Sequence, residues 1–327
     1  MLPRFAFAAA VLCVSLTGCG SQTPPSASQT STFDVQQYEL ENEVMTQELE
    51  TQRLREQLAQ EQQASRGAQS PAAPAARSAT SDTSRTSGAR AGALLSAADR
   101  RSFAALERSL GGPAGVAIAS GETVSVTGTL RGGPAWSTIK VPLTIAAGRA
   151  GDTQNARLAI TASDNAAAAR MWRSLGAGRT AAAAVQHVLA DGGDRRTRVQ
   201  AQQTRPPFSA FGQTSWRLSD QAQFFAQLEC VQGSEQTLQH MRQVVADQRW
   251  GLGQLDGDVR FKGGWGPGTS GGYVARQAAV IDRDGRPLAV AAIARGADMQ
   301  AAVRMLDQIT AWVGEHMPAQ LRAQPSC

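Results

Sequence analysis

Hydrophobic and polar positions follow three regimes along the 327 residues of the chain. Apolar residues run almost unbroken near the N-terminus, polar residues dominate the long stretch that follows, and regular hydrophobic periodicity begins only near Ser96. Only this last region has enough apolar positions at helical and strand spacing to build a core. We therefore expect a signal peptide over residues 1–18, an anchored segment and linker over 19–94, and a folded domain over 95–327.

Within the folded domain the spacing of apolar residues changes twice. Ser96-Ala97-Ala98-Asp99 has the form of a capping box and predicts a helix to about Leu110, where Gly111-Gly112-Pro113 follows. Short apolar or alternating runs predict strands, and helical spacing predicts a helix-rich middle and a closing helix. The expected strands are 114–120, 123–129, 259–263, 273–282 and 287–294, and the expected helical regions are 137–247, interrupted at 191–208, and 298–317.

This order of elements predicts the fold class. Strands at both ends of the domain, with helices between them, indicate an α/β (α+β) domain. We expect an antiparallel sheet built from both ends and flanked by helices, with an all-helical subdomain inserted in the middle. A ligand site is expected where the two parts meet.

The N-terminal segment has the features of an export signal. Arg4 precedes an apolar run that is too short to span a membrane as a mature helix. Leu16-Thr17-Gly18-Cys19 resembles the bacterial lipobox, and the resemblance implies that Cys19 becomes lipidated after cleavage. The mature protein would then be anchored at the outer face of the cytoplasmic membrane. The alternative is an ordinary secretory signal with a chance cysteine.

Two segments separate this signal from the folded domain. Residues 34–63 are rich in Gln and Glu, and their apolar positions follow helical spacing too irregular for a strict heptad repeat. We expect a solvated helix there, a possible contact region for a partner. Residues 64–94 are rich in Ala, Ser, Thr, Arg and Pro, and are expected to form a disordered spacer.

Composition and charge narrow the functional classes. The chain carries a net charge of +5, and residues 95–327 hold 25 basic residues against 18 acidic ones. A basic domain favours an anionic ligand or membrane surface, but no basic-aromatic stripe or known nucleic-acid motif is present, so nucleic-acid binding is not expected. No apolar run of membrane-spanning length lies outside the N-terminus, which excludes a multispanning membrane protein.

The cysteines fit an exported protein. Cys13 lies in the signal peptide and Cys19 in the lipobox, which leaves Cys230 and Cys327 as a possible disulfide, with two free thiols as the alternative. No metal or other cofactor is expected, because neither the cysteines nor the histidines have metal-ligand spacing. The histidines are His187, His240 and His316.

The strongest chemical signal involves lysine, of which the chain has only two among 32 basic residues. Ser137-Thr138-Ile139-Lys140 is expected to open a helix, with the hydroxyl and the amine on one side. An amine with a lowered pKa can take a proton from a serine, although a capping Ser followed by an exposed Lys has the same pattern. Further along lie Ser163-Asp164-Asn165, between two Ala-rich helices, and Phe261-Lys262-Gly263-Gly264, at the expected end of a strand.

In order, spacing and context, these three motifs resemble the S-x-x-K, S-D-N and K-T-G motifs of class A β-lactamases and penicillin-binding proteins. The resemblance covers residues 95–327. It implies an acylated nucleophile at Ser137, a general base at Lys140, a proton shuttle at Ser163, and a substrate pocket lined by Asn165, Lys262 and Gly264. It also implies an oxyanion hole formed by the N–H of Ser137 and that of Trp265 or Gly266. The substrate would be a β-lactam or a peptidoglycan-like amide or ester.

Two departures from the family pattern affect what the site can do. No Glu occurs between Glu122 and Glu229, whereas class A enzymes carry one on the loop after the S-D-N lobe to activate the deacylating water. Asp191 or Asp194 could substitute, although the arginines at 195, 196 and 198 would pair with them. Gly263 replaces the Thr of K-T-G, and Thr269, Ser270 or Arg276 either compensate for it or are ordinary turn and strand residues.

These observations predict an envelope lipoprotein whose domain is acylated on Ser137 and deacylates slowly. Efficient hydrolysis or acyl transfer is a second hypothesis. The third is a catalytically silent lipoprotein that uses the same fold to bind an envelope ligand or a protein partner.

Overall fold

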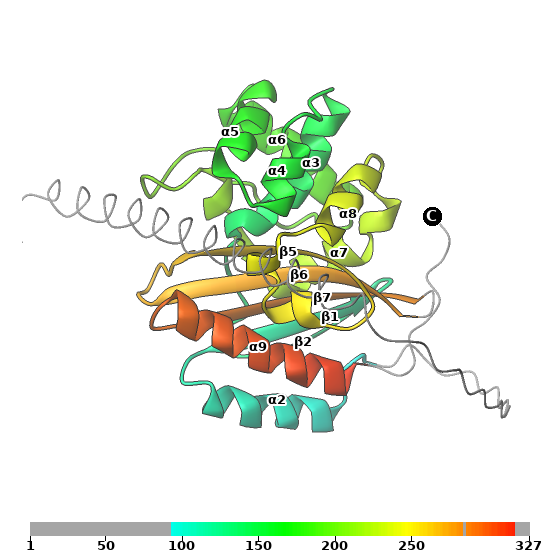
Figure 1. Ribbon diagram of the computed structural model, residues 1–327, viewed down its shortest axis with the longest axis vertical. Helices are drawn as coiled ribbons and strands as arrows, with labels where there is room; N and C mark the ends of the chain where they lie inside the picture. Colours follow the sequence, from blue (N-terminus) through cyan, green and yellow to red (C-terminus); the bar gives the residue numbers. More distant parts are fainter. Residues whose placement is uncertain (1–92, 284–285, 318–327) are drawn as a thin grey trace, which may run out of the picture. The chain divides into compact units, whose positions relative to one another are not determined.

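The computed structural model describes residues 93–283 and 286–317 (Figure 1). The predictions about the signal peptide, Cys19, the segment 34–63, the linker and Cys327 lie outside these residues. Within them, eight α-helices and seven strands form a mixed α/β fold with an antiparallel sheet, as predicted. None of the described helices is both long and apolar enough to cross a bilayer.

The main sheet has five strands in the order β2-β1-β7-β6-β5, and every neighbouring pair is antiparallel. Strands from the two ends of the domain therefore lie side by side, β1 pairing with β7 at its centre. This confirms the predicted topology. The strands are β1 (Ala114–Ser120), β2 (Thr123–Gly128), β5 (Asp258–Pro267), β6 (Tyr273–Arg283) and β7 (Arg286–Gly296).

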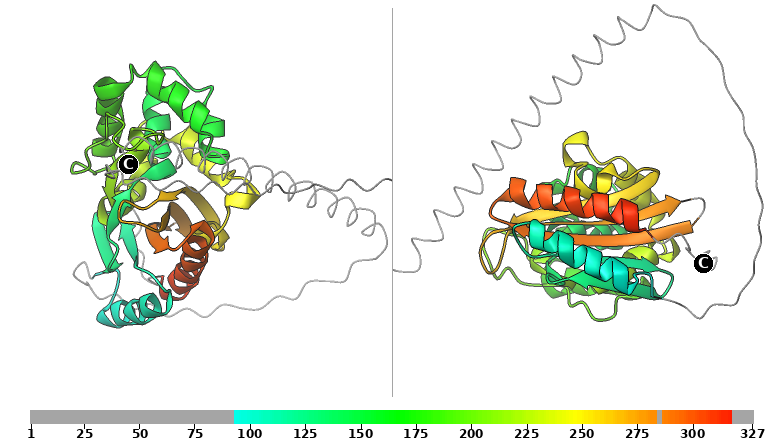
Figure 2. Two further views of the ribbon diagram at one scale, coloured as in Figure 1. Left: turned by 90° about the vertical axis from the view of Figure 1, so that its left-hand side faces the viewer. Right: turned by 90° about the horizontal axis from the view of Figure 1, so that it is seen from below.

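Both faces of the sheet are covered, which explains why its central strands are almost continuously apolar. Helices α2 (Ala97–Ser109) and α9 (Met299–His316) pack on one face (Figure 2). Between them, Phe103 contacts Trp312 edge to face, with ring centroids 5.0 Å apart. Helix α7 (Leu218–Ala226) packs on the other face, against β1 and β7. Alternate β1 residues enter the two cores: Val116 and Ile118 face α2 and α9, whereas Ala117 and Ala119 face the opposite core.

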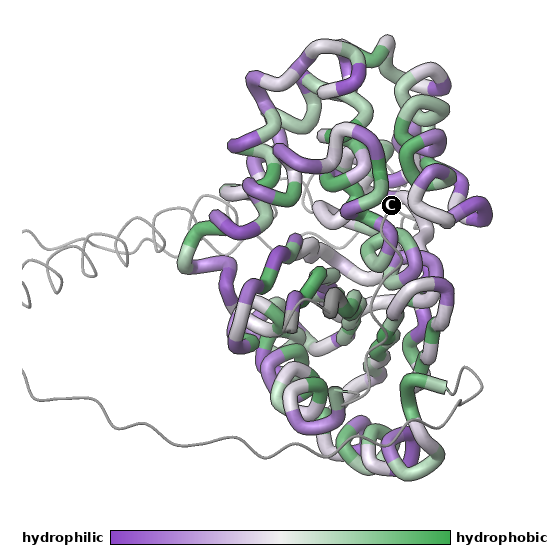
Figure 3. Tube along the Cα trace, turned by 90° about the vertical axis from the view of Figure 1, so that its right-hand side faces the viewer, coloured by the Kyte–Doolittle hydropathy of each residue, from purple (hydrophilic) through white to green (hydrophobic). Residues whose placement is uncertain are grey.

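The helical part lies above the sheet in Figure 1 and contains α3 to α6 and α8. Its helices alternate hydrophobic and hydrophilic stretches (Figure 3), and many of their buried positions are Ala, which lets them pack closely. Their bounds are α3 (Lys140–Arg149), α4 (Ala156–Thr161), α5 (Asn165–Ser174), α6 (Gly178–Asp191) and α8 (Glu235–Arg242). The short 3-10 helices are Trp136–Ile139, Phe211–Gln213, Leu228–Cys230, Ala246–Gln248 and Gly251–Gln254.

The structure differs from the sequence prediction in three local respects. β3 (Gly132–Pro134) and β4 (Ser215–Arg217) form a two-stranded sheet. No strand was predicted in either segment, and 215–217 was expected to be helical, because the pairing joins segments far apart in sequence. Strand β5 does not end near Gly263 but continues to Pro267 through a glycine-rich run that normally indicates a turn. The third difference concerns Ser137, whose helix begins as a 3-10 turn.

Candidate active site

The predicted nucleophile lies in the short 3-10 helix Trp136–Ile139, and Lys140 is the first residue of α3. The helix predicted to open at Ser137 therefore begins one residue earlier, as a 3-10 turn that continues into α3. The consequence is favourable, because in a 3-10 helix the side chains at i and i+3 eclipse one another. Trp136 has a φ of 47°, a left-handed conformation that is costly for a bulky residue and occurs preferentially at functional sites.

Ser163 lies in the turn between α4 and α5, as predicted. It also has a left-handed backbone, with a φ of 58°. The next residue, Asp164, caps α5 by accepting a hydrogen bond from the N–H of Ala167 at 2.5 Å. This cap fixes the direction of the turn, and with it the side chains of Ser163 and Asn165.

Both lysines of the chain reach Ser163. Lys140 Nζ lies 3.5 Å from Ser163 Oγ and 2.8 Å from Asn165 Oδ1, and it also donates to the Ser163 carbonyl oxygen. Lys262 Nζ donates to Ser163 Oγ at 2.8 Å and to the Gly263 carbonyl at 2.9 Å. The three motifs therefore meet in space, each on a different element: α3, the α4–α5 turn and β5.

The two amines are buried to a degree that lysine seldom tolerates. The exposed fraction is 1% for Lys140 and 0% for Lys262. Burial lowers the pKa of Lys140 to about 7, against an opposing effect of the Asp164 carboxylate. Burial also lowers the pKa of Lys262 well below its usual value, and the neighbouring Lys140 lowers it further. At neutral pH a substantial fraction of the Lys140 amine, three residues after Ser137, is therefore neutral.

Gly264 brings β5 against the nucleophile turn, which is the 3-10 helix Trp136–Ile139 with the predicted nucleophile Ser137. A Cβ at this position would lie 2.7 Å from the backbone nitrogen of Ser137 and 2.9 Å from that of Thr138, so only glycine fits. Gly266 is constrained in the same way, since its Cβ would lie 2.6 Å from the Trp136 ring. The glycine-rich run thus serves close approach rather than a turn.

β5 is an edge strand, so alternate residues direct their N–H and C=O groups away from β6. The Gly263 carbonyl is one of these outward groups, because it accepts the bond from Lys262 Nζ. With a period of two, the next outward N–H belongs to Trp265. This alternation favours Trp265 over Gly266 as the strand donor closest to Ser137.

Ser137 itself is half-buried, and within the described residues its Oγ forms no hydrogen bond. The Ser137–Lys140 hydrogen bond that the family resemblance suggests is thus absent in this conformation, in which Lys140 contacts Ser163 and Asn165 instead. Such contacts are often long before substrate binds. The hydroxyl is free to rotate toward a ligand or toward the amine.

Comparison with solved structures now decides the architecture. An ancestral (GNCA) class A β-lactamase aligns with 66% of this chain and 99% of its own at 20% identity, with a TM-score of 0.51. The β-lactamases of Sphaerobacter thermophilus DSM 20745 and Xanthomonas campestris pv. campestris str. ATCC 33913 align over 68% and 67% of this chain and 98% and 97% of theirs, each at 18% identity and a TM-score of 0.53. The chain has the fold of class A β-lactamases. No family model and no curated protein matches the sequence.

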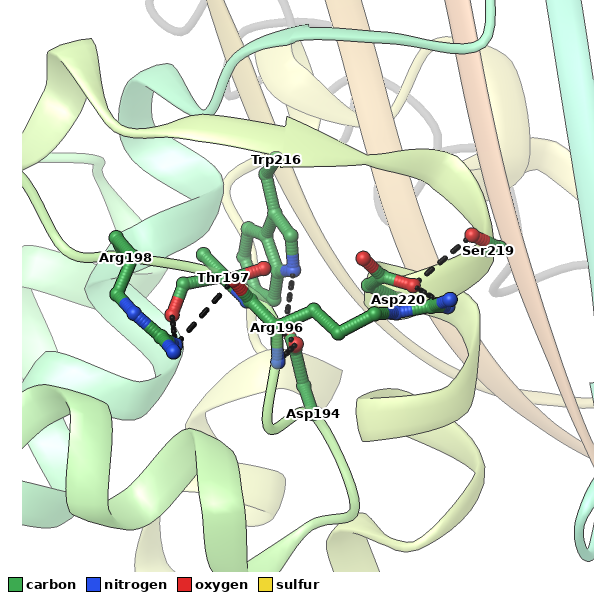
Figure 4. A network of polar contacts seen from close by, with 7 residues as sticks. All are labelled: Asp194, Arg196, Thr197, Arg198, Trp216, Ser219 and Asp220. Carbon is green, nitrogen blue, oxygen red and sulfur yellow. Dashed lines mark hydrogen bonds and ion pairs between the residues drawn. The ribbon is translucent and has the colours of Figure 1, made fainter.

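Within this β-lactamase-like domain, the loop after α6 holds the two acids considered as substitutes for the missing Glu. Asp194 is 2% exposed, and its carboxylate is fully engaged (Figure 4). One oxygen accepts from the backbone N–H groups of Arg196 and Thr197, at 3.1 and 3.0 Å, and the other from the Trp216 indole at 2.8 Å. Asp194 therefore shapes the loop, and its carboxylate is buried with both oxygens already accepting hydrogen bonds, which is a poor position from which to activate a water.

Asp191 is also occupied. It forms an ion pair with Arg149 at 2.7 Å, on the exposed end of α6. The expected pairing of both acids with the loop arginines is wrong, because Arg196 pairs with Asp220 and Arg198 donates to loop carbonyl groups. Residues 195–213 contain no acid at all, so the carboxylate that this described loop supplies is that of the buried Asp194.

The same loop packs against the nucleophile turn. Phe208 contacts the Trp136 ring edge to face, with ring centroids 5.1 Å apart. Arg205 Nη1 donates to the Pro267 carbonyl, at the end of β5, at 3.3 Å. The side chain of Gln213 holds the loop together through bonds to Thr204 and to the backbone of Arg205. The loop therefore places an aromatic ring against the turn that carries Ser137, and a cation, Arg205, at the end of β5.

Three residues were considered as replacements for the Thr of K-T-G, and they differ in exposure. Thr269 and Ser270 are exposed in the β5–β6 turn. Arg276 is wrong as a substrate ligand, because it is 0% exposed and its guanidinium donates to backbone carbonyl groups. Burial lowers its pKa to about 9. Beside Gly263, at 3.4 Å from the position of its absent Cβ, lies the ring of Trp250, which forms an edge-to-face pair with Trp265.

The sequence reasoning missed the contributions of Asp164, Asp194 and Trp136. Asp164 was visible as a residue directly before an Ala-rich helix, which is an N-cap signal. Asp194 and Trp136 gave no local signal, because their roles depend on partners distant in the chain.

The disulfide prediction is met on one side only. Cys230 is disulfide-bonded, and it ends the 3-10 helix Leu228–Cys230. Cys327 lies outside the described residues, so the pairing of these two cysteines stays a prediction.

Proposed function

We propose that this protein is an envelope lipoprotein whose β-lactamase-like domain is acylated on Ser137 by a β-lactam or a related amide or ester. The observation that carries the proposal is the convergence of the two buried lysines on Ser163, beside Ser137. Burying two amines is expensive, and a silent scaffold would gain nothing from it. Perturbed lysines at the junction of two lobes are typical of active sites.

The acylation step follows from the positions of these groups. Neutral Lys140 takes the proton of Ser137 Oγ as that oxygen attacks the carbonyl carbon, and a C–O bond forms. The N–H groups of Ser137 and Trp265 stabilise the oxyanion. When the C–N bond breaks, the leaving nitrogen receives a proton through Ser163, which both lysines contact. Asn165 and Lys262 line the substrate side.

Deacylation requires a second base aimed at a water, and the acids of the loop are engaged elsewhere. Loss of a general base typically slows a step by about 10²–10⁴-fold. The acyl-enzyme should therefore be long-lived. This places the protein closer to penicillin-binding behaviour than to efficient β-lactam hydrolysis.

Intact-mass spectrometry of the folded domain after incubation with a fluorescent penicillin tests the proposal. The expected result is a stoichiometric mass increase on Ser137 that is absent in Ser137→Ala and persists after the free penicillin is removed. Rapid multiple turnover would contradict slow deacylation. Absence of an adduct with several β-lactams would contradict the proposed reaction.

The alternative function is a catalytically silent lipoprotein that binds an envelope ligand or a protein partner. The lack of a hydrogen bond between Ser137 and Lys140, together with the glycine in place of the K-T-G threonine, favours it. In that case penicillin binding, if any, would be non-covalent and unaffected by Ser137→Ala.

The proposed location rests on the lipobox at Leu16-Thr17-Gly18-Cys19. The full chain should partition with membranes into detergent, and Cys19→Ala should release it or leave it unprocessed. Unchanged mass and membrane association in Cys19→Ala would exclude lipid anchoring. The segment 34–63 remains a proposed contact region for a partner.

A further inference from the structure

Two arginines are buried among the described residues, and they are buried in different ways. Arg260, on β5, forms ion pairs with Glu229 and, at 3.4 Å, with Asp258. Arg276, on β6, is 0% exposed and forms no ion pair with any described residue. Burying a guanidinium without a counter-charge is costly, so its presence calls for a specific gain.

The Arg276 guanidinium spreads its charge over backbone carbonyl groups. Nη1 donates to the carbonyl oxygens of Gly133 and Pro134, at 3.0 Å each. Both Nη atoms lie 3.3 Å from the Trp216 carbonyl, and Nη2 also donates to the Gln221 side chain. These contacts fasten β3 and β4 to the main sheet.

The fastened segment leads directly into the nucleophile turn. Pro134 is held by Arg276, and the N–H of Ala135 donates to the Thr214 carbonyl at 2.7 Å. The next residue, Trp136, carries the left-handed φ of 47°, and Ser137 follows. A strained residue persists only when its surroundings over-determine it. The contacts on its N-terminal side provide that constraint.

Arg276 also lies opposite Gly264 in the β5–β6 pair, and Gly264 is the point where β5 meets the backbone of Ser137. Arg276 therefore connects the two sides of the proposed oxyanion site. Its side chain binds the β3 carbonyl groups that precede Ser137. Its backbone pairs with Gly264, next to Trp265 on β5. Hydrophobic residues could fill the space but could not bind four acceptors at once.

We infer that Arg276 is a positioning residue for acylation, which sets the nucleophile turn relative to β5 through the carbonyl groups of Gly133 and Pro134. The inference rests on the proposed acylation of Ser137. Arg276 exchanges no proton and touches no substrate. Its effect should therefore appear in the acylation rate constant and not in substrate affinity, since a misplacement of about 1 Å can cost on the order of 10²-fold in rate.

The test compares Arg276→Met with Arg260→Met, a matched control that removes the other buried guanidinium. For each folded protein, penicillin acylation is measured at several concentrations, which separates the acylation rate constant from the dissociation constant. Arg276→Met should lower the rate constant by about 10- to 100-fold with the dissociation constant within about threefold, and Arg276→Lys should recover part of it, because an ammonium reaches fewer carbonyl groups. Arg260→Met should lose thermal stability but keep its acylation rate constant within about twofold.

Hydrogen–deuterium exchange of residues 133–139 gives a readout that does not depend on acylation. It should rise in Arg276→Met and stay unchanged in Arg260→Met. Wild-type acylation kinetics in Arg276→Met, or an equal loss in Arg260→Met, would overturn the inference. If the wild type is not acylated, the proposed function fails. The exchange measurement then decides by itself whether Arg276 holds the turn, and unchanged exchange in Arg276→Met would reject that role.

Discussion

The Ser163 cluster, formed by Lys140, Ser163, Asn165 and Lys262, and the loop after α6 use charge in opposite ways. Around Ser163, two lysines are buried, neither is hydrogen-bonded to a carboxylate of the described residues, and burial lowers the pKa of both. In the loop, every nearby acid is satisfied: Asp194 by backbone N–H groups and an indole, and Asp191 by Arg149. The first region leaves its amines without a carboxylate hydrogen-bond partner among the described residues. The second holds its carboxylates in hydrogen bonds or an ion pair.

The difference bears on the two halves of the proposed reaction. Acylation needs a nucleophile, a neutral amine and an oxyanion site, and the residues for all three meet at Ser163 and β5. Deacylation needs a base that faces a water. Asp194 is buried with both oxygens accepting hydrogen bonds, and Asp191 is paired with Arg149. The presence of a hydrolase fold therefore does not by itself imply turnover.

The largest expected effect is loss of acylation when the first region is broken. Ser137→Ala and Lys140→Ala should each reduce adduct formation with penicillin by at least about 10³-fold. The double variant should be no worse than either single one, because the two residues act as a unit. Time-resolved intact-mass measurements give the rates. Retention of the adduct in Ser137→Ala would place the nucleophile elsewhere.

The next effect concerns the second region. The wild-type adduct should deacylate about 10²–10⁴-fold more slowly than one with a positioned base, and Asp191→Asn and Asp194→Asn should leave its lifetime unchanged. The measurement is loss of the added mass over hours after free penicillin is removed. A longer lifetime in either variant would show that the loop carboxylate acts as the base after all.

A smaller effect, about tenfold per pH unit, should mark the pH dependence of acylation. Lys140 must be neutral to accept the proton, and burial lowers its pKa to about 7. The acylation rate should thus rise with pH to a midpoint near 7 and level off above it. Stopped-flow acylation between pH 5.5 and 9 measures the profile. A rate that still rises about tenfold per pH unit up to pH 9 would contradict Lys140 as the base.

The smallest effect is structural. Asp194→Asn places an amide donor against either the Trp216 indole or the two backbone N–H groups, so it should lower the free energy of unfolding by about 1–3 kcal/mol. The acylation rate of the folded protein should stay within about twofold of wild type, because the loop carboxylate takes no part in that step. Thermal denaturation measures the first quantity. A large loss of acylation in Asp194→Asn would show instead that the loop acts on the nucleophile turn, through the contact between Phe208 and Trp136.

Much of the architecture could be predicted from the sequence, because it depends on local patterns. The capping box at Ser96, the fully apolar β1 and the single helical face of α9 each specify an element within a few residues. The lysine usage pointed to the site, since a chain that otherwise uses Arg retained Lys at the two positions where a removable proton has a use. Motif order then indicated which elements must meet.

Other features were decided only by tertiary structure, because they arise between residues far apart in the chain. In the sequence, Gly264 and Gly266 indicate a turn. In the fold they lie in β5 against Trp136 and Ser137, where no side chain fits. In the sequence Asp194 is a candidate base, but in the fold it accepts a hydrogen bond from the Trp216 indole. In the sequence Arg276 is a candidate substrate ligand, but in the fold it donates to the β3 carbonyl groups. A residue type states which bonds it can form, whereas packing determines which of them are already taken.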